Sequence, residues 1–97
     1  MSEYAEFLRK DMRLVILRLL AQMPSYTANS SVLCTGLNEI GHNPSRDQVK
    51  NEIRWLEEQG LVTVKEVFDL LVARITERGA DCADGRITVH GVKKPGA

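Results

Sequence analysis

The hydrophobic pattern of the chain changes its period at Gly60. Before this glycine, apolar side chains recur every three or four residues, which is the spacing of one face of a helix. After it, residues 61–67 and 70–76 are rich in β-branched side chains, which is typical of strands. Two strands separated only by a turn at Phe68-Asp69 are expected to pair as an antiparallel hairpin. The order of these segments predicts an α+β fold.

Capping residues and glycines mark the ends of four expected helices. Pro24 stops the first helix, and Gly41 stands where a left-handed C-terminal cap is expected. Ser45 opens the third helix and forms a capping-box pattern with Gln48. The second and third helices are joined by a short turn, as in a helix-turn-helix. The expected helices span residues 2–23, 31–40, 45–59 and 77–83, with a polar connection at 24–30 and a brief extended piece at 87–89.

The first helix carries apolar residues on almost all sides at positions 14–17, 19 and 20. At about 100° per residue, the leucine, valine and isoleucine side chains of this stretch point almost all round the helix axis. Such a helix must be covered on more than one side, so we expect a homodimer in which a partner chain covers one of them. The alternative is that later elements of the same chain wrap the helix completely. The expected dimer contacts are Leu8, Val15, Ile16 and Leu19.

Two stretches resemble parts of a winged helix-turn-helix domain. Residues 54–62, with the sequence RWLEEQGLV, are similar to the junction between a recognition helix and the first strand of the wing. Residues 75–79, with the sequence ITERG, resemble the leucine-threonine-x-x-glycine element that closes the wing in multiple-antibiotic-resistance and phenolic-acid-type regulators. The tail, with GVKKP at 91–95, is similar to that of small winged-helix proteins of Mu-like phages and prophages.

The resemblance covers about residues 10–85. It implies a three-helix core, a two-stranded antiparallel wing and a short C-terminal helix in a domain at residues 1–85, followed by a basic tail at 86–97. It further implies double-stranded DNA binding by a phage, prophage or bacterial transcriptional regulator, or by an accessory factor, in the bacterial cytoplasm. Winged helices also serve dimerisation and docking, so the alternative is a non-enzymatic module that binds a phage or host protein.

The third helix is expected to carry the DNA contacts. Val49, Ile53 and Leu56 recur at i, i+4 and i+7 and are expected to face the core. The amino-terminal half of the opposite face would enter the major groove, where Asn51 could pair with an adenine edge and an arginine could reach guanine or phosphate. The candidate DNA-binding residues are Ser45, Arg46, Lys50, Asn51, Arg54 and, in the wing, Lys65.

The charge of the chain argues against strong DNA binding. Thirteen basic and thirteen acidic residues give a net charge of zero. One copy alone is expected to bind DNA weakly, because phosphate neutralisation is the main sequence-independent source of affinity and the third helix holds more acidic than basic residues. Arg86, Lys93 and Lys94 form a basic arm that a dimer would present twice. A solvated mixed-charge surface and a protein-docking surface are the alternatives.

Other chemistry has little support in the sequence. Cys34 and Cys82 lie far apart, and neither has a second ligand at metal-binding spacing, so no zinc site or disulfide framework is expected. His42 falls in a turn and His90 in the tail, so no catalytic set and no enzyme activity are expected. The acidic amino terminus is unlike a signal peptide, and no apolar run is longer than the four residues of Leu14–Leu17, which is too short for a membrane span. No cofactor is expected.

Two aromatic residues close to the expected DNA-binding elements are interpreted as structural. Trp55 adjoins the core position Leu56 and is expected to pack against the wing hairpin rather than to stack on a base. Tyr26 lies in the loop before the second helix and is expected to be a partly buried anchor of that loop.

Overall fold

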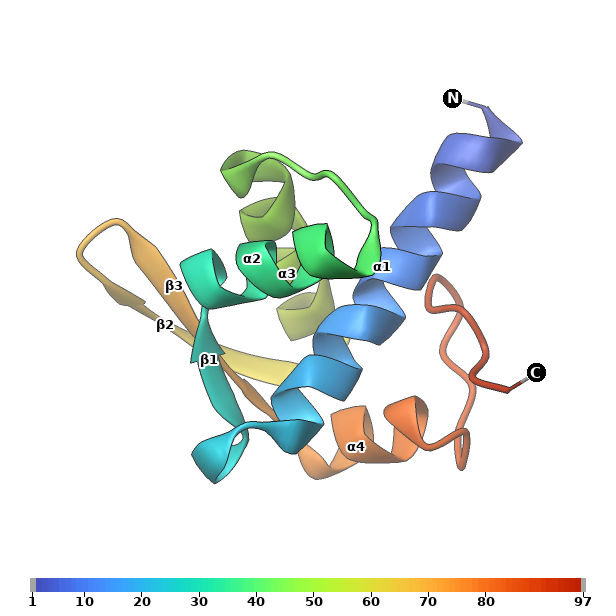
Figure 1. The fold of residues 1–97 in the computed structure, drawn as a ribbon. Coiled ribbons are helices and arrows are strands. Elements are labelled where there is room, and N and C mark those ends of the chain that lie inside the picture. Colours follow the sequence, from blue (N-terminus) through green and yellow to red (C-terminus); the bar gives the residue numbers. More distant parts are fainter. Residues whose placement is uncertain (1, 97) are drawn as a thin grey trace.

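A computed structural model describes residues 2–96, in which helices cover one face of a small antiparallel sheet (Figure 1). The fold is therefore α+β, as expected, and it is compatible with a winged helix-turn-helix. Within this part of the chain, no helix has both the length and the apolar character needed to cross a membrane. The elements are α1 (Glu3–Gln22), the 3-10 helix η1 (Pro24–Tyr26), β1 (Thr27–Asn29), α2 (Ser30–Ile40), α3 (Arg46–Glu58), β2 (Val62–Val67), β3 (Leu70–Ile75) and α4 (Glu77–Ala83).

The expected caps set the helix boundaries. The backbone amide of Gln48 donates a hydrogen bond to Ser45 Oγ at 3.1 Å, which fixes the start of α3. Thr76 caps α4 in the same way by accepting from the amide of Gly79. Gly41 ends α2 at φ 109°, a left-handed conformation that a residue with a Cβ adopts only with strain. The start of α2 differs from the expectation, because the cap is Asn29 and the helix begins at Ser30.

The sheet has three strands in the order β1-β3-β2, all antiparallel. The expected hairpin is confirmed as β2 and β3, but the connection expected at residues 24–30 contains the third strand. In β1 only Ala28 is buried, so three residues with one apolar position give no readable alternation. Side chains alternate between the faces of the sheet. Leu71, Ala73 and Ile75 of β3 are buried beneath the helices.

The core is built around α1. Ile16, Leu17 and Leu20 are fully buried by the rest of the chain, and Val15 is only 9% exposed. Leu19 packs on α2 so closely that a Cβ on Gly36 would lie 2.8 Å from its Cδ1 atom. The expectation that Val15 and Ile16 need a partner chain is therefore wrong, because the chain itself wraps them. The homodimer stays a prediction, and its remaining expected contacts, Leu8 and Leu19, are half-buried.

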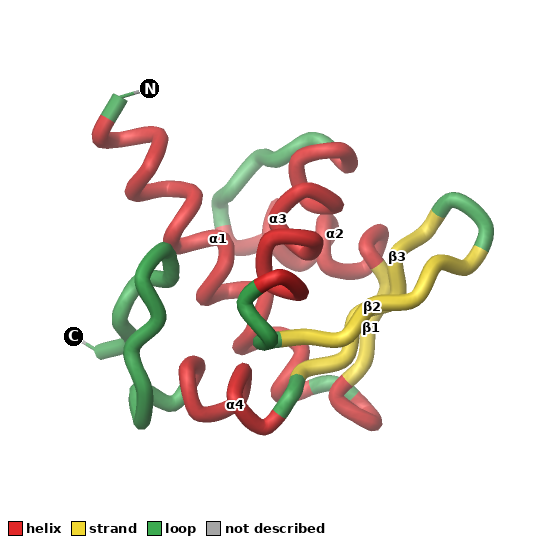
Figure 2. Tube along the Cα trace, turned by 180° about the vertical axis from the view of Figure 1, so that it is seen from behind, coloured by secondary structure: helices red, strands yellow, loops and turns green. Residues whose placement is uncertain are grey.

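The segment after α4 packs against α1 instead of extending as a basic arm (Figure 2). Val89 and Val92 are buried, and the amide of Lys93 donates to the carbonyl of Lys10 at 3.2 Å. Lys93 also pairs with Asp11 at 3.3 Å, while Arg86 pairs with Asp81 at 3.3 Å. The extended piece expected at 87–89 does not form a strand.

Trp55 is structural, but its partner is not the hairpin. Arg13 of α1 lies 3.8 Å above the centre of the Trp55 ring, and a Cβ on Gly91 would come within 2.5 Å of the same ring. The indole is therefore held between α1 and the segment after α4. The interpretation of Tyr26 as a partly buried anchor is wrong, because this side chain is exposed.

Candidate nucleic-acid interface

The buried face of α3 follows the expected spacing. Val49, Ile53 and Leu56 are all fully buried against the core. Asn51 and Asp47 consequently lie on the exposed side. The orientation of the helix about its axis is thus as expected, and the amino-terminal half of its outer face is open to a ligand.

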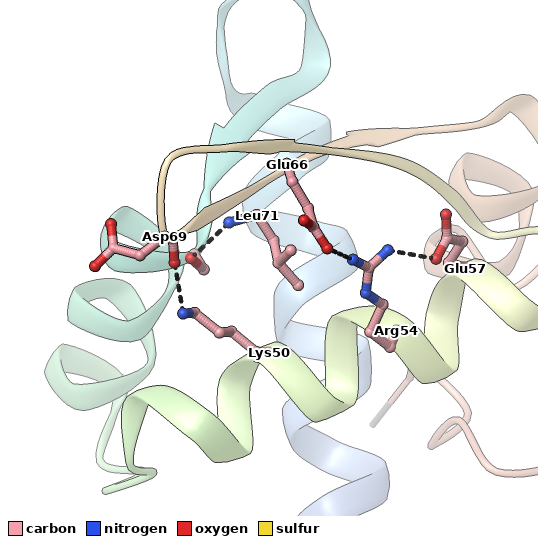
Figure 3. A network of polar contacts seen from close by, with 7 residues as sticks. Lys50, Arg54, Glu57, Glu66, Asp69 and Leu71 are labelled. Atoms are coloured by element: carbon pink, nitrogen blue, oxygen red, sulfur yellow. Dashed lines mark hydrogen bonds and ion pairs between the residues drawn. The ribbon is translucent and has the colours of Figure 1, made fainter.

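The outer side of α3 and the hairpin enclose a notch, which we define by its lining residues: Lys50, Asn51, Arg54, Glu66, Phe68, Asp69, Leu70 and Leu71. Within the notch, the Lys50 ammonium donates to the backbone carbonyl of Asp69, and the Arg54 guanidinium binds the carboxylate of Glu66 (Figure 3). Arg54 also pairs with Glu57 at 3.0 Å. These contacts tie the hairpin to α3.

Two of the expected DNA contacts are therefore engaged within the protein. Arg54 was expected to face solvent, but its side chain is only 40% exposed and is turned toward two carboxylates. A phosphate or base would have to compete with Glu66 and Glu57 for this guanidinium. Lys50 keeps its charge uncompensated, because its partner is a carbonyl, but its ammonium is held at the hairpin.

On α3, Arg46 and Asn51 are the free members of the expected set. Both side chains are exposed, and neither has a hydrogen-bond or ion-pair partner among residues 2–96. Ser45 stands at the same end of α3, where its side chain accepts from the Gln48 amide and so already uses one of the amides of the first turn. The open half of α3 thus offers one guanidinium and one side-chain amide.

Lys65 is not brought together with the α3 residues. It alternates along β2 with Glu66, whose side chain reaches Arg54 on the helix side of the sheet. Lys65 therefore points to the opposite face of the sheet, where its neighbour is Arg74 of β3. Arg74 was not singled out from the sequence, because only the strand register reveals that it shares a face with Lys65.

The tip of the hairpin is apolar rather than basic. Phe68 is 98% exposed, and its φ of 56° is unusual for a residue with a bulky side chain. Val67 beside it is also exposed, and Asp69 follows. An exposed aromatic ring in a strained turn is a feature that functional surfaces often have.

Glu52 is a buried carboxylate that the sequence pattern did not reveal. Its Oε1 atom accepts from Arg13 Nε at 2.7 Å, and Arg9 lies 3.9 Å from its Oε2 atom. The Glu52 side chain is only 6% exposed. Its position, three residues after Val49 and four before Leu56, places it at the edge of the buried face. This pair holds α3 against α1 behind the candidate interface.

The turn between α2 and α3 is attached to α1 by a second polar cluster. His42 Nε2 lies 2.7 Å from Asp11 Oδ2, and Lys93 contacts the other oxygen of this carboxylate. Burial raises the pKa of Asp11, but the hydrogen bonds and charges of His42 and Lys93 outweigh it, so the pKa lies below its usual value. Among residues 2–96, no three histidine, cysteine or acidic side chains are placed to hold a metal ion.

Comparison with known proteins places the chain in a phage-associated group. No family model matches the sequence. It is 48% identical over 90 residues to protein gp26 of Escherichia phage Mu, covering 93% of each chain. The chain belongs to the gp26 family of phage Mu. An uncharacterized protein of Haemophilus influenzae is 43% identical over 81 residues, covering 82% of this chain and 78% of that protein. The gp26 match spans so much of the chain that it includes α3 and the hairpin.

Proposed function

We propose that this member of the gp26 family is a winged helix-turn-helix protein that binds double-stranded DNA as a regulator or accessory factor. The observation that supports this function is the open amino-terminal half of α3, where Arg46 and Asn51 are exposed and without a partner. A helix presented in this way beside a hairpin suits the major groove of a duplex.

Each exposed residue has a distinct role in this proposal. The side-chain amide of Asn51 can donate to N7 and accept from N6 of adenine, which no other base edge matches in the major groove. Arg46, in the first turn, reaches a phosphate or the acceptor edge of guanine. Lys50 contributes charge next to the groove while it holds the hairpin. Because few cations are free, the affinity is expected to be modest and to fall with salt.

The paired variant Arg46→Ala/Asn51→Ala tests this assignment. We expect the dissociation constant for duplex DNA to rise roughly 10- to 100-fold, because one base contact and one cationic contact are lost. The slope of log affinity against log salt should fall by about 1. Fluorescence anisotropy on a labelled random duplex, at several salt concentrations, measures both quantities. Arg54 and Lys50 are less suitable targets, since their removal also loosens the hairpin.

The control is Arg18→Ala/Asn38→Ala, which removes the same two residue types from exposed positions on α1 and α2. This variant should bind like the unmodified protein. If both pairs weaken binding equally, α3 does not read the DNA. If the unmodified protein shows no binding to duplex at tens of micromolar in low salt, the proposal is wrong.

A second candidate function is docking to a phage or host protein. The exposed Phe68 favours it, because an exposed aromatic ring is a typical anchor for an apolar pocket of a partner. The tip also carries Asp69, which phosphates would repel. The absence of binding to duplex in the titration described above would favour protein docking over DNA binding.

A further inference from the structure

The face of the sheet that points away from the helices has no covering layer within residues 2–96 (Figures 1 and 2). Strand alternation and register define this surface, which we call the open sheet face. A shallow depression lies on it, between β1, β2 and β3. The depression is lined by Thr27, Thr63, Val64, Lys65, Val72 and Arg74.

The open sheet face is basic and carries no acid. Lys65 and Arg74 are exposed, and neither has an ion-pair or hydrogen-bond partner in the described chain. The other residues that point the same way on β2 and β3 are Thr63, Val67, Leu70 and Val72. The notch is different, because carboxylates there already occupy Arg54. Two uncompensated cations in a neutral chain thus lie side by side.

The strand register brings the polar groups of this face together. Thr63 of β2 is directly opposite Arg74 of β3, and Lys65 is the next residue of β2 on the same face. The Thr27 hydroxyl is not available as a donor, because it donates to the Ser25 carbonyl at 2.8 Å. The Thr63 hydroxyl has no such partner in the described chain. An anion in the depression would therefore meet a guanidinium, an ammonium and a hydroxyl donor.

We propose that the open sheet face binds backbone phosphates of nucleic acid through Lys65, Arg74 and Thr63. Adjacent cations with a hydroxyl donor suit the repeated, closely spaced anions of a phosphodiester chain. A polypeptide strand would gain no main-chain hydrogen bonds on this face, because the strands already use those groups in the sheet. The site lies on the opposite side of the sheet from the notch, so it does not depend on the function proposed for α3.

The variant Lys65→Ala/Arg74→Ala tests this site. Two fluorescein-labelled probes, a 20-nucleotide thymidine strand and a random duplex, distinguish single-stranded from double-stranded backbone. Fluorescence anisotropy at several salt concentrations gives the slope of log affinity against log salt for each probe. If the site binds the single strand, the variant should lower this slope by about 1.4, and if it binds the duplex, by about 1.8, because two phosphate contacts are lost. Thermal unfolding checks that both exposed substitutions leave the fold intact.

The matched control is Arg18→Ala/Lys94→Ala, which removes two cations from exposed positions on α1 and in the tail. It should leave the salt slope unchanged. If the slope falls equally in both variants, or does not change in Lys65→Ala/Arg74→Ala, the proposed site is wrong. Loss of binding to a labelled decaglutamate peptide, with no change for either nucleic acid, also overturns it. The variant Arg46→Ala/Asn51→Ala is measured with the same probes. Its effect tests the DNA contacts of α3 independently of the open sheet face.

Discussion

Truncating Leu56 to alanine is expected to lower the free energy of unfolding by about 2–5 kcal/mol. Leu56 is fully buried, and it lies on α3 where the helix meets the core. The loss has two parts: the transfer free energy of the atoms that are removed from the core, and the cost of the cavity that remains. Urea denaturation followed by circular dichroism measures the change.

Ile40→Ala is the matched control for Leu56, because it removes a similar side chain from a residue that is 56% exposed. The control is expected to cost less than about 1 kcal/mol. If the two variants lose the same stability, Leu56 is not on the buried face, and the outward orientation of Asn51 is wrong as well.

Replacing Arg13 with methionine is expected to cost about 3–5 kcal/mol. This change leaves the Glu52 carboxylate buried with only Arg9, 3.9 Å away, as a cation. It also removes the hydrogen bond to the carbonyl of Gly91 and the stacking on Trp55. Urea denaturation measures the loss, and the fluorescence of Trp55 reports whether the segment after α4 has loosened.

Two further variants distinguish the effect of breaking the buried ion pair from the effect of removing a positive charge. Arg86→Met removes a guanidinium that is 72% exposed, and it should cost less than about 1 kcal/mol. The double variant Arg13→Met/Glu52→Leu should recover most of the stability lost by Arg13→Met, because no carboxylate is left unpaired. If Arg13→Met is as stable as Arg86→Met, the buried pair of Arg13 and Glu52 does not stabilise the fold as proposed.

The sequence predicted most elements of the fold because their signals are local. Ser45, Thr76 and Gly41 act through hydrogen bonds and backbone angles within one turn of helix, so their positions alone indicate the boundaries. The hairpin is equally local, since its two strands adjoin the turn. The strand β1 was missed because its three residues are stabilised by pairing with β3, more than forty positions away.

The candidate site was predicted only in part, for the same reason. Periodicity placed Asn51 on the exposed side of α3, but it carries no information on what the hairpin presents to the neighbouring Arg54. Lys65 and Arg74 share a face of the sheet only because of the strand register. The ion pair of Glu52 with Arg13 depends on how α3 packs across α1. The tail, with Val89 and Val92 among polar and basic residues, gave too short a pattern to predict packing.

The most direct test of the DNA-binding proposal is a nuclear magnetic resonance titration of the isotope-labelled protein with a short duplex at low salt. We expect the backbone amide resonances of residues 45–51 to shift with the largest amplitude as duplex is added. The amide resonances of α4, which lies well away from the start of α3 (Figure 1), should not shift. If the resonances of residues 45–51 do not shift while the protein binds the duplex, α3 does not carry the DNA contacts.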